Sequence, residues 1–392
     1  MTALPTRIAR AGRIVGVVRD ETAAPVPARA AERAEPARQS VLLREAQRAA
    51  GAVRPLPALR PQGRRPYAAL DLGTNNCRLL IAEPAPYGFR VVDAFSRIVR
   101  LGEGLGSTDH LSDEAIQRTV EALAVCRAKM ETRGVVRSKV IATEACRLAV
   151  NGPDFVRRVR RDVGLNLEVV DRRTEAYLAV TGCAALADRH AESVVIFDIG
   201  GGSTEIVWLH GSAALARSAD PTLRIRAWDS LPVGVVTLTE RYGGTDVTPA
   251  IFEGMVEDVS TKLTKFALMA GAAAQAPHFH LLGTSGTVTT LAAMHLRLPR
   301  YDRRRIDGLW MSDREVSTAI TDLLDTRLAE RARNPCIGRD RADLVLAGCA
   351  ILEAIRRAFP SERLRIADRG LREGLLMNMM REDGVWRRGG RG

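Results

Sequence analysis

Three features are missing from this sequence of 392 residues. None of its six cysteines are spaced as Cys-x-x-Cys, so neither a zinc site nor a disulfide framework is indicated. No apolar run reaches the roughly 18 residues that a membrane helix needs, and the N-terminus lacks a basic segment followed by an apolar one. We therefore expect a soluble, cytoplasmic protein with reduced thiols and no membrane partner.

Excess basic charge is scarce outside one segment, although the whole chain has a net charge of +12. Residues 1–66 contain thirteen arginines and five acidic residues, together with eight of the eighteen prolines. The remainder has little excess charge, which argues against a basic docking face for nucleic acid. We expect residues 1–66 to be a disordered, solvated extension, with a loose anchor to polyanions as the alternative.

Beyond this extension the pattern becomes regular and predicts an α/β fold. Residues 67–84 read as a strand, a glycine-containing turn and a second strand, and a third strand follows at 88–101. An amphipathic helix is expected between Ser112, as N-cap, and Gly134. The strand, helix and strand over residues 138–171 are typical of a βαβ unit and therefore of a parallel sheet.

One motif occurs twice, 127 positions apart: ALDLGTNNCRLLIA at 69–82 and IFDIGGGSTEIVWL at 196–209. Self-similarity over this distance indicates two related domains rather than a short-period repeat. Two such hairpins facing each other would form a cleft. We predict a first domain at 67–180, a second at 181–385 and a flexible tail at 386–392; a C-terminal helix that packs back on the first domain is compatible with this division.

The turn of each copy has residues suited to phosphate. Glycines let the backbone approach a ligand and expose N–H groups, and Ser and Thr hydroxyls add further donors. For a single copy, a tight turn that needs positive φ is the alternative. The candidate phosphate-binding residues are Gly73, Thr74, Asn75 and Asn76 in the first turn and Gly200, Gly201, Gly202, Ser203 and Thr204 in the second.

The carboxylates beside the turns indicate a divalent cation. Asp71 and Asp198 end the first strand of each hairpin and would repel a phosphate. Mg²⁺ is commonly held by one or two carboxylates together with phosphate oxygens and waters, and so resolves this conflict. The two aspartates are therefore candidate metal ligands, and Glu205 is a further ligand or a residue that holds a water. Mn²⁺ is the alternative ion.

With four further motifs, these stretches resemble the exopolyphosphatase and guanosine pentaphosphate phosphohydrolase (Ppx/GppA) family of the actin and sugar kinase superfamily. The resemblance covers about residues 67–380. It rests on DLGTNN from Asp71, VRLGEGL from Val99, ATEACR ending at Arg147, DIGGGSTE from Asp198, GTSGT from Gly283 and REG from Arg372. It implies two ribonuclease-H-like domains flanking a cleft, and family members often form dimers, which makes a homodimer an expectation as well. The lack of a His-Asp dipeptide fits the short, two-domain form of the family.

The resemblance also implies a general base. In the family this is a glutamate in a Ser-Gly-x-Glu-Glu-Ala pattern, on a helix that enters the cleft. The corresponding stretch here is DRRTEA, in which Glu175 falls on the base. The stretch departs from the pattern because Asp171 and Arg172 replace Ser-Gly and Thr174 replaces the first Glu.

Two cations are implied in the same way. Arg147 matches an arginine that the family directs at a phosphate, and Lys262 aligns with a helical lysine that contacts phosphate. Glu144, near the cleft by sequence, is expected to cap a helix or pair locally.

Phosphoanhydride hydrolysis needs an in-line water and charge neutralisation, and each has a candidate here. The leading hypothesis is an exopolyphosphatase that releases orthophosphate from polyphosphate ends, with Glu175 activating the water. Removal of a phosphate from guanosine pentaphosphate is the first alternative. An actin-superfamily ATP-dependent kinase or switch is the second, to which the fold alone would also point.

Overall fold

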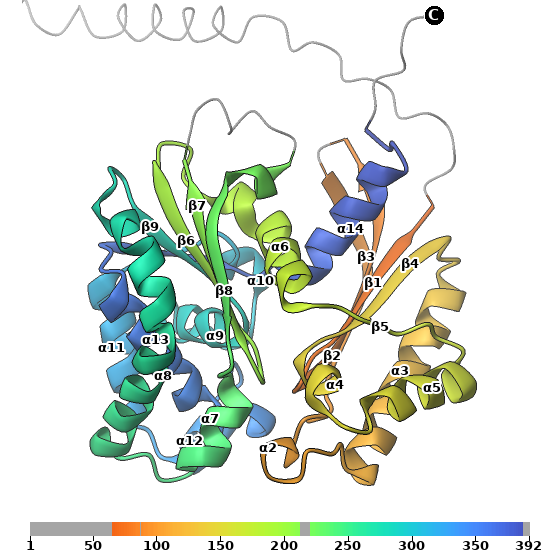
Figure 1. The fold of residues 1–392 in the computed structure, drawn as a ribbon, viewed down its shortest axis with the longest axis horizontal. Coiled ribbons are helices and arrows are strands. Elements are labelled where there is room, and N and C mark those ends of the chain that lie inside the picture. Colours follow the sequence, from red (N-terminus) through yellow and green to blue (C-terminus); the bar gives the residue numbers. More distant parts are fainter. Residues whose placement is uncertain (1–64, 87, 212–219, 387–392) are drawn as a thin grey trace, which may run out of the picture. The chain divides into compact units, whose positions relative to one another are not determined.

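The computed structural model describes residues 65–86, 88–211 and 220–386. The predicted extension at 1–66 lies outside these residues except for its last two, and the predicted tail at 386–392 except for its first. The described elements form two mixed sheets with flanking helices (Figure 1), which confirms the α/β class. In these ranges no helix combines the length and apolarity needed to cross a membrane.

The first lobe is built on a five-stranded sheet of order β3-β2-β1-β4-β5. Its strands are β1 (Tyr67–Leu72), β2 (Asn76–Ala85), β3 (Gly88–Ile98), β4 (Arg137–Ala142) and β5 (Glu168–Val169), and its helices are α2 (Leu105–Thr108), α3 (Asp113–Thr132), α4 (Glu144–Leu148) and α5 (Gly152–Val163). The first three strands are an antiparallel meander, and β4 and β5 of the βαβ unit run parallel, as the sequence predicts. In addition, β4 runs parallel to β1. Ser112 caps α3 by accepting the N–H of Ala115.

The second lobe is built on a six-stranded sheet of order β10-β11-β9-β6-β7-β8. Its strands are β6 (Ser193–Ile199), β7 (Thr204–His210), β8 (Ile225–Leu231), β9 (His280–Thr284), β10 (Trp310–Ser312) and β11 (Arg363–Ala367). Its helices are α7 (Val235–Tyr242), α8 (Pro249–Ala270), α9 (Gly286–His295), α10 (Arg303–Ile306), α11 (Asp313–Leu324), α12 (Leu328–Arg333) and α13 (Val345–Ala358). The order β8-β7-β6-β9-β11 repeats that of the first sheet, so the internal repeat extends beyond the hairpins to the strand order.

Two helices, α6 (Arg172–Cys183) and α14 (Leu371–Glu382), lie between the sheets (Figure 1). The predicted domain boundary at 180/181 falls inside α6. Apolar residues of α6 pack on the second sheet, whereas those of α14 pack on β1 and β2 of the first. The helices cross so closely that a Cβ on Gly182 would lie 1.9 Å from the carbonyl oxygen of Gly370, and one on Gly374 would lie 2.2 Å from that of Leu178. Glycine is therefore required at this crossing, which fixes where α6 enters the space between the lobes.

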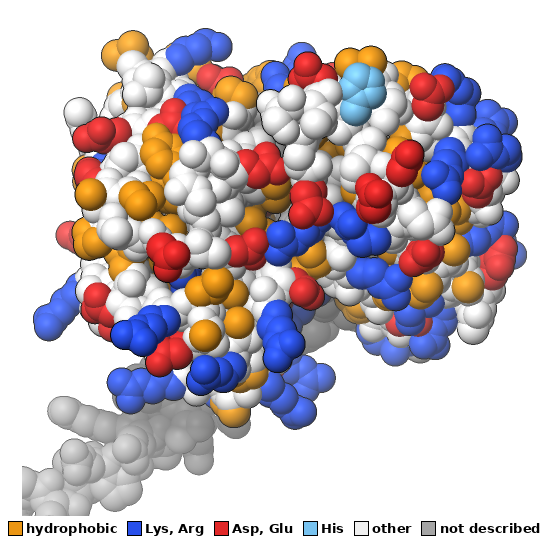
Figure 2. Space-filling model, turned by 90° about the horizontal axis from the view of Figure 1, so that it is seen from below, with side chains coloured by type: hydrophobic (Ala, Val, Ile, Leu, Met, Phe, Trp, Pro, Cys, Tyr) orange, Lys and Arg blue, Asp and Glu red, His pale blue; other side chains and the backbone are white. Residues whose placement is uncertain are grey.

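The lobes also touch where α2 approaches α7 (Figure 1). The N–H of Gly104 donates to Glu240 Oε1 at 2.8 Å, and Arg100 Nη2 donates to Asp343 Oδ2 at 3.0 Å. Figure 2 views the molecule from this side and shows acidic side chains interspersed with basic ones over both lobes.

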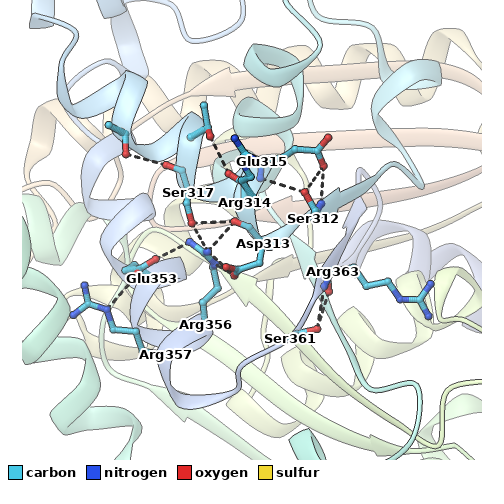
Figure 3. Close-up of polar contacts among 12 residues, drawn as sticks. Ser312, Asp313, Arg314, Glu315, Ser317, Glu353, Arg356, Arg357, Ser361 and Arg363 are labelled. Carbon is cyan, nitrogen blue, oxygen red and sulfur yellow. Dashed lines mark hydrogen bonds and ion pairs between the residues drawn. The ribbon is translucent and has the colours of Figure 1, made fainter. Parts of the chain in front are cut away.

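A network of ion pairs ties α11 to α13 within the second lobe (Figure 3). Arg356 donates to Asp313 Oδ1 at 2.5 Å, to Ser317 Oγ at 2.6 Å and to Glu353 Oε2 at 2.7 Å. Its side chain is 9% exposed, so these acceptors satisfy a largely buried guanidinium. None of these residues lines the cavity between the lobes described below.

Candidate active site

The two hairpin loops have the same backbone turn. In the first, the N–H of Gly73 donates to the carbonyl oxygen of Asn76 at 2.9 Å; in the second, the N–H of Gly200 donates to that of Ser203 at 2.9 Å. Neither glycine has a positive φ. The alternative explanation of these glycines, a turn that needs positive φ, is therefore wrong.

The residues that flank each turn also pair in the same register. Asp71 on β1 lies opposite Arg78 on β2, and Asp198 on β6 lies opposite Glu205 on β7. The aspartates end equivalent strands, as the repeat predicts, but their cross-strand neighbours have opposite charges.

The second loop is bare because it passes directly against the first. A Cβ on Gly201 would lie 3.0 Å from Thr74 Cβ and 3.1 Å from the backbone nitrogen of Asn75. A Cβ on Gly202 would lie 2.7 Å from Thr74 Oγ1. The side chains of the first loop thus occupy the room that the glycines of the second leave open.

A cavity of about 120 Å³ lies where the loops meet, between the lobes. Twelve of the fifteen predicted site residues line it: Asp71, Gly73, Thr74, Asn75, Asn76, Glu175, Asp198, Gly200, Gly201, Gly202, Ser203 and Glu205. The fold therefore brings together residues from two strand ends, two turns and the first turn of α6.

The aspartates at the strand ends are held in an environment that disfavours their charge. Burial raises the pKa of Asp71, and burial with repulsion from Asp71 raises the pKa of Asp198 to about 6. Arg78 and Arg372 lower both pKa values and so offset part of this effect. The cavity thus contains carboxylates whose charge the protein only partly compensates.

Glu205 is buried in the same cavity, and burial with repulsion from Asp198 raises its pKa to about 7. Its Oε1 accepts hydrogen bonds from the hydroxyls of Ser203 and Ser230, each at 2.8 Å. These bonds favour the ionised form but do not outweigh burial.

Glu175 enters the cavity from the first turn of α6, where the N-cap Asp171 accepts the N–H of Thr174 at 2.7 Å. Burial and repulsion from Glu205 raise the pKa of Glu175 well above its usual range, although Arg147 opposes the shift. Arg147 Nη2 donates to Glu175 Oε2 at 2.8 Å. A carboxylate with a raised pKa, held by one oxygen, is a stronger base than an exposed glutamate.

Arg147 is fixed on three sides. Besides Glu175, it donates to Glu144 Oε2 from Nε at 3.0 Å and from Nη2 at 2.6 Å, and to the carbonyl oxygen of Val170 from Nη1 at 2.6 Å. Glu144 also accepts bonds from Arg172 at 2.6 and 3.3 Å. Glu144 pairs with local cations, as expected, and it also lines the cavity.

Three predicted residues do not line the cavity. Arg147 lies behind Glu175, as described. Thr204 is fully buried, and its hydroxyl donates to the carbonyl oxygen of Val233 at 2.7 Å, which gives it a role in holding the hairpin. Lys262, on α8, pairs with Asp258 one turn earlier, so the structure does not bring it to the loops.

Sequence reasoning missed other lining residues. The internal repeat could have identified Arg78, because Arg78 follows Asp71 at the same spacing as Glu205 follows Asp198. The turn at Ser285, which precedes α9, also lines the cavity; it was not missed, since the sequence alone leaves open whether the GTSGT turn contacts phosphate or only joins a strand to a helix. Arg341 lines it too, and no motif marks that residue.

A divalent cation fits the residues of the cavity. The side-chain amide oxygens (Oδ1) of Asn75 and Asn76 are buried without a hydrogen-bond partner, and Asp71, Asp198 and Glu205 have raised pKa values. In the described residues, no three His, Cys, Asp or Glu side chains are grouped closely enough to hold a metal by themselves. A cation here would need phosphate oxygens and waters as further ligands, which suits Mg²⁺.

Comparison with known proteins gives related sequences. A bifunctional 3-dehydroquinate synthase/phosphatase from Fusobacterium nucleatum is 26% identical over 318 residues, which cover 77% of this chain and 44% of that protein. A guanosine-5'-triphosphate,3'-diphosphate pyrophosphatase from Pseudoalteromonas translucida is 27% identical over 327 residues, which cover 83% of this chain and 61% of that protein. This chain therefore spans less than two thirds of either relative.

Solved structures share the fold. The crystal structure of the Ppx/GppA family member of Aquifex aeolicus is 28% identical with a TM-score of 0.66, and the match covers 81% of this chain and 98% of that one. An exopolyphosphatase from Cytophaga hutchinsonii is 23% identical with a TM-score of 0.72 over 82% and 99% of the two chains, a likeness of fold alone. The model of the Ppx/GppA phosphatase family matches residues 80–383, and the chain therefore belongs to that family.

Proposed function

We propose that this protein hydrolyses the terminal phosphoanhydride bond of inorganic polyphosphate and releases orthophosphate. The observation that carries the proposal is the position of Glu175, a buried carboxylate with a raised pKa that shares one cavity with both phosphate loops. Similarity to the crystal structure of an exopolyphosphatase-like protein, 27% identical over 81% of this chain and 99% of that one, supports the choice of polyphosphate.

The residues supply the parts of an in-line displacement by water. Backbone N–H groups of the loops would bind the terminal phosphate, with positive charge from Arg147 nearby. Arg147 holds Glu175 Oε2, and within the described ranges no hydrogen bond reaches Oε1. Oε1 would accept a proton from the water while the water oxygen attacks the terminal phosphorus. The bond from this phosphorus to the bridging oxygen then breaks, and the shortened chain leaves.

Mg²⁺, or Mn²⁺ as the alternative, is proposed to be held by Asp198 and Glu205, with Asp71 near. The cation would offset the negative charge that develops on the transferring phosphate.

Guanosine pentaphosphate is the second candidate substrate. The observation in its favour is the similarity to the guanosine-5'-triphosphate,3'-diphosphate pyrophosphatase, over a larger share of this chain than the other relative covers. The chemistry of the cavity would be the same for both substrates, because each ends in a phosphoanhydride.

The test is phosphate release by purified full-length protein with Mg²⁺, with polyphosphate and guanosine pentaphosphate in parallel. Glu175→Gln should lower the rate by about 10²–10⁴-fold while substrate binding, measured by calorimetry, persists. Glu168→Gln is the matched control, because this exposed glutamate on β5 pairs with Lys139 outside the cavity.

Each result is decisive for one part of the proposal. An unchanged rate for Glu175→Gln would remove this residue from the mechanism. Much faster release of phosphate from guanosine pentaphosphate would make it the leading substrate and polyphosphate the second candidate. Transfer of phosphate to an organic acceptor instead of water would favour the kinase alternative.

A further inference from the structure

A chain of alternating charges lies behind the cavity and ends on Glu175. Arg172 Nη2 donates to Glu144 Oε1 at 2.6 Å, Arg147 Nη2 donates to Glu144 Oε2 at 2.6 Å, and the same Nη2 donates to Glu175 Oε2 at 2.8 Å. The order is therefore cation, anion, cation, anion. Its members come from α4 and from the first turn of α6.

Glu144 is the central member and has almost no contact with solvent. Its side chain is 2% exposed, so an unpaired negative charge at this position would be strongly unfavourable. Burial raises its pKa, but the bonds from Arg172 and Arg147 outweigh burial and hold that pKa below its usual range. Glu144 is therefore an ionised buried anchor for two guanidinium groups.

Arg147 alone would be shared between two carboxylates. Its Nη2 contacts both Glu144 and Glu175, and the two anions compete for one cation. Arg172 changes this balance because it supplies Glu144 with a second positive charge. Glu144 then depends less on Arg147, and Arg147 can pair more strongly with Glu175.

We propose that Glu144 and Arg172 are positioning residues, which hold the guanidinium of Arg147 against Glu175 so that the base keeps one oxygen directed at the substrate water. The inference rests on the proposed function, since it assigns Glu175 as the base. Neither residue touches the reacting atoms: Glu144 faces the cavity but directs both oxygens at arginines, and Arg172 does not line the cavity.

Arg172 is also one of the three positions at which this sequence departs from the family pattern, where a glycine is usual. The pattern therefore offers no partner for Glu144 at this position, whereas this chain provides one. Arg173, the next residue on α6, is the natural comparison, because it is exposed and its guanidinium lies 5.1 Å from the centre of the Tyr177 ring.

Steady-state kinetics on the full-length protein test the coupling. Glu144→Gln should lower kcat by about 10²-fold, because a small displacement of Arg147 disturbs the reacting geometry. Arg172→Ala should lower kcat by about 10-fold, Arg172→Lys should restore part of the loss, and Arg173→Ala should have no effect. Because Arg172 acts through Glu144, the double variant Glu144→Gln/Arg172→Ala should be no slower than Glu144→Gln alone. Losses that multiply in the double variant, or single variants as fast as wild type, would overturn the proposal.

Exchange of the Arg147 Nε–H proton with solvent gives a readout that does not need turnover. With ¹⁵N-labelled arginine and no substrate, its signal is assigned by its loss in Arg147→Lys. We expect slow exchange in the wild type and in Arg173→Ala, and faster exchange in Glu144→Gln and Arg172→Ala, with thermal unfolding showing that each variant is folded.

The two measurements separate the inference from the function on which it rests. Unchanged exchange in folded variants would contradict the positioning role even if their rates fell. If the wild-type protein released no phosphate from either substrate, the proposed function would fail, and the exchange rates would still decide whether Glu144 and Arg172 hold Arg147.

Discussion

The hairpins at residues 69–82 and 196–209 share a turn hydrogen bond and a strand register, yet they differ in two respects. The position opposite the strand-end aspartate is Arg78 in the first and Glu205 in the second. The first loop has side chains at Thr74 and Asn75, and the second has glycines at the equivalent places. One backbone therefore serves two roles: the first hairpin supplies contacts and a positive charge, and the second supplies negative charge and bare backbone.

The difference follows from the way the loops face each other. Two loops with side chains could not approach so closely, because Thr74 already occupies the room beside Gly201 and Gly202. Two hairpins with a pair of acids each would add one more carboxylate to the five that already line the cavity, whereas Arg78 lowers the pKa values of Asp71 and Asp198. The differences between the hairpins thus avoid a steric clash between the two loops and limit the negative charge in the cavity.

Among changes to the two hairpins, the largest effect should come from replacing each strand-end aspartate by asparagine, one at a time. Asp198→Asn should lower Mg²⁺-dependent phosphate release by about 10²–10³-fold, because it removes an anion from the hairpin proposed to hold the cation. Asp71→Asn should lower it by only about 10-fold, since Arg78 lies opposite. Rates measured across a Mg²⁺ titration check this, and a greater loss for Asp71→Asn would assign the cation to the first hairpin.

The next effect concerns stability and pH. The pKa of Glu205 is raised to about 7 in the folded protein, so the folded state favours the protonated side chain. The stability that protonated Glu205 contributes is fully present below about pH 4.5 and is lost as the pH rises through 7. Glu205→Gln should therefore raise the free energy of unfolding at pH 8 by on the order of 3 kcal/mol, with little gain at pH 5. Arg78→Gln should lower stability at pH 8, because it leaves Asp71 and Asp198 with only Arg372 of the two arginines that lower their pKa values.

Calorimetric unfolding of both variants between pH 5 and pH 8, with a chelator present, measures this contrast. A gain for Glu205→Gln that stays constant with pH would show that burial of charge is not its cause. A gain for Arg78→Gln at pH 8 would contradict the opposite roles of the two positions.

The smallest effect tests the fit of the loops. Gly202→Ala should destabilise the protein by about 1–3 kcal/mol, because its Cβ would lie 2.7 Å from Thr74 Oγ1. Adding Thr74→Ala should recover part of the loss by removing that oxygen. Gly271→Ala is the control, since this glycine has a helical backbone and open space around it. Thermal unfolding measures all three, and equal stability of Gly202→Ala and wild type would mean that the loops do not press together.

Much of the fold could be read from local pattern. The meander at residues 67–101 and α3 behind its Ser112 cap were predicted because alternation, turn residues and capping act over a few positions. The last strand of the βαβ unit predicted over 138–171 pairs with β4 only at Glu168–Val169, since register with β4 and not apolar content sets its length.

For the site, the sequence predicted some of the cavity residues and not others. The loop residues and Glu175 follow from the repeat and from the family resemblance, and they line one cavity. Lys262 aligned with a phosphate contact, but α8 turns it toward Asp258, and a helix match does not specify which neighbour a flexible side chain meets. Arg341 comes from a segment without any motif and reaches the cavity only through the packing of the second lobe.

The sequence by itself determined the two four-residue turns, the aspartates that precede them and the hairpin strands on either side of them, because hydrogen bonding and side-chain alternation are local. Only the tertiary structure decided that the turns lie against each other, that Arg147 bonds Glu175, and that the pKa values of Asp198 and Glu205 rise to about 6 and about 7. Charge interactions and burial depend on distances between residues that are far apart in the chain, and the packing of the two lobes sets those distances.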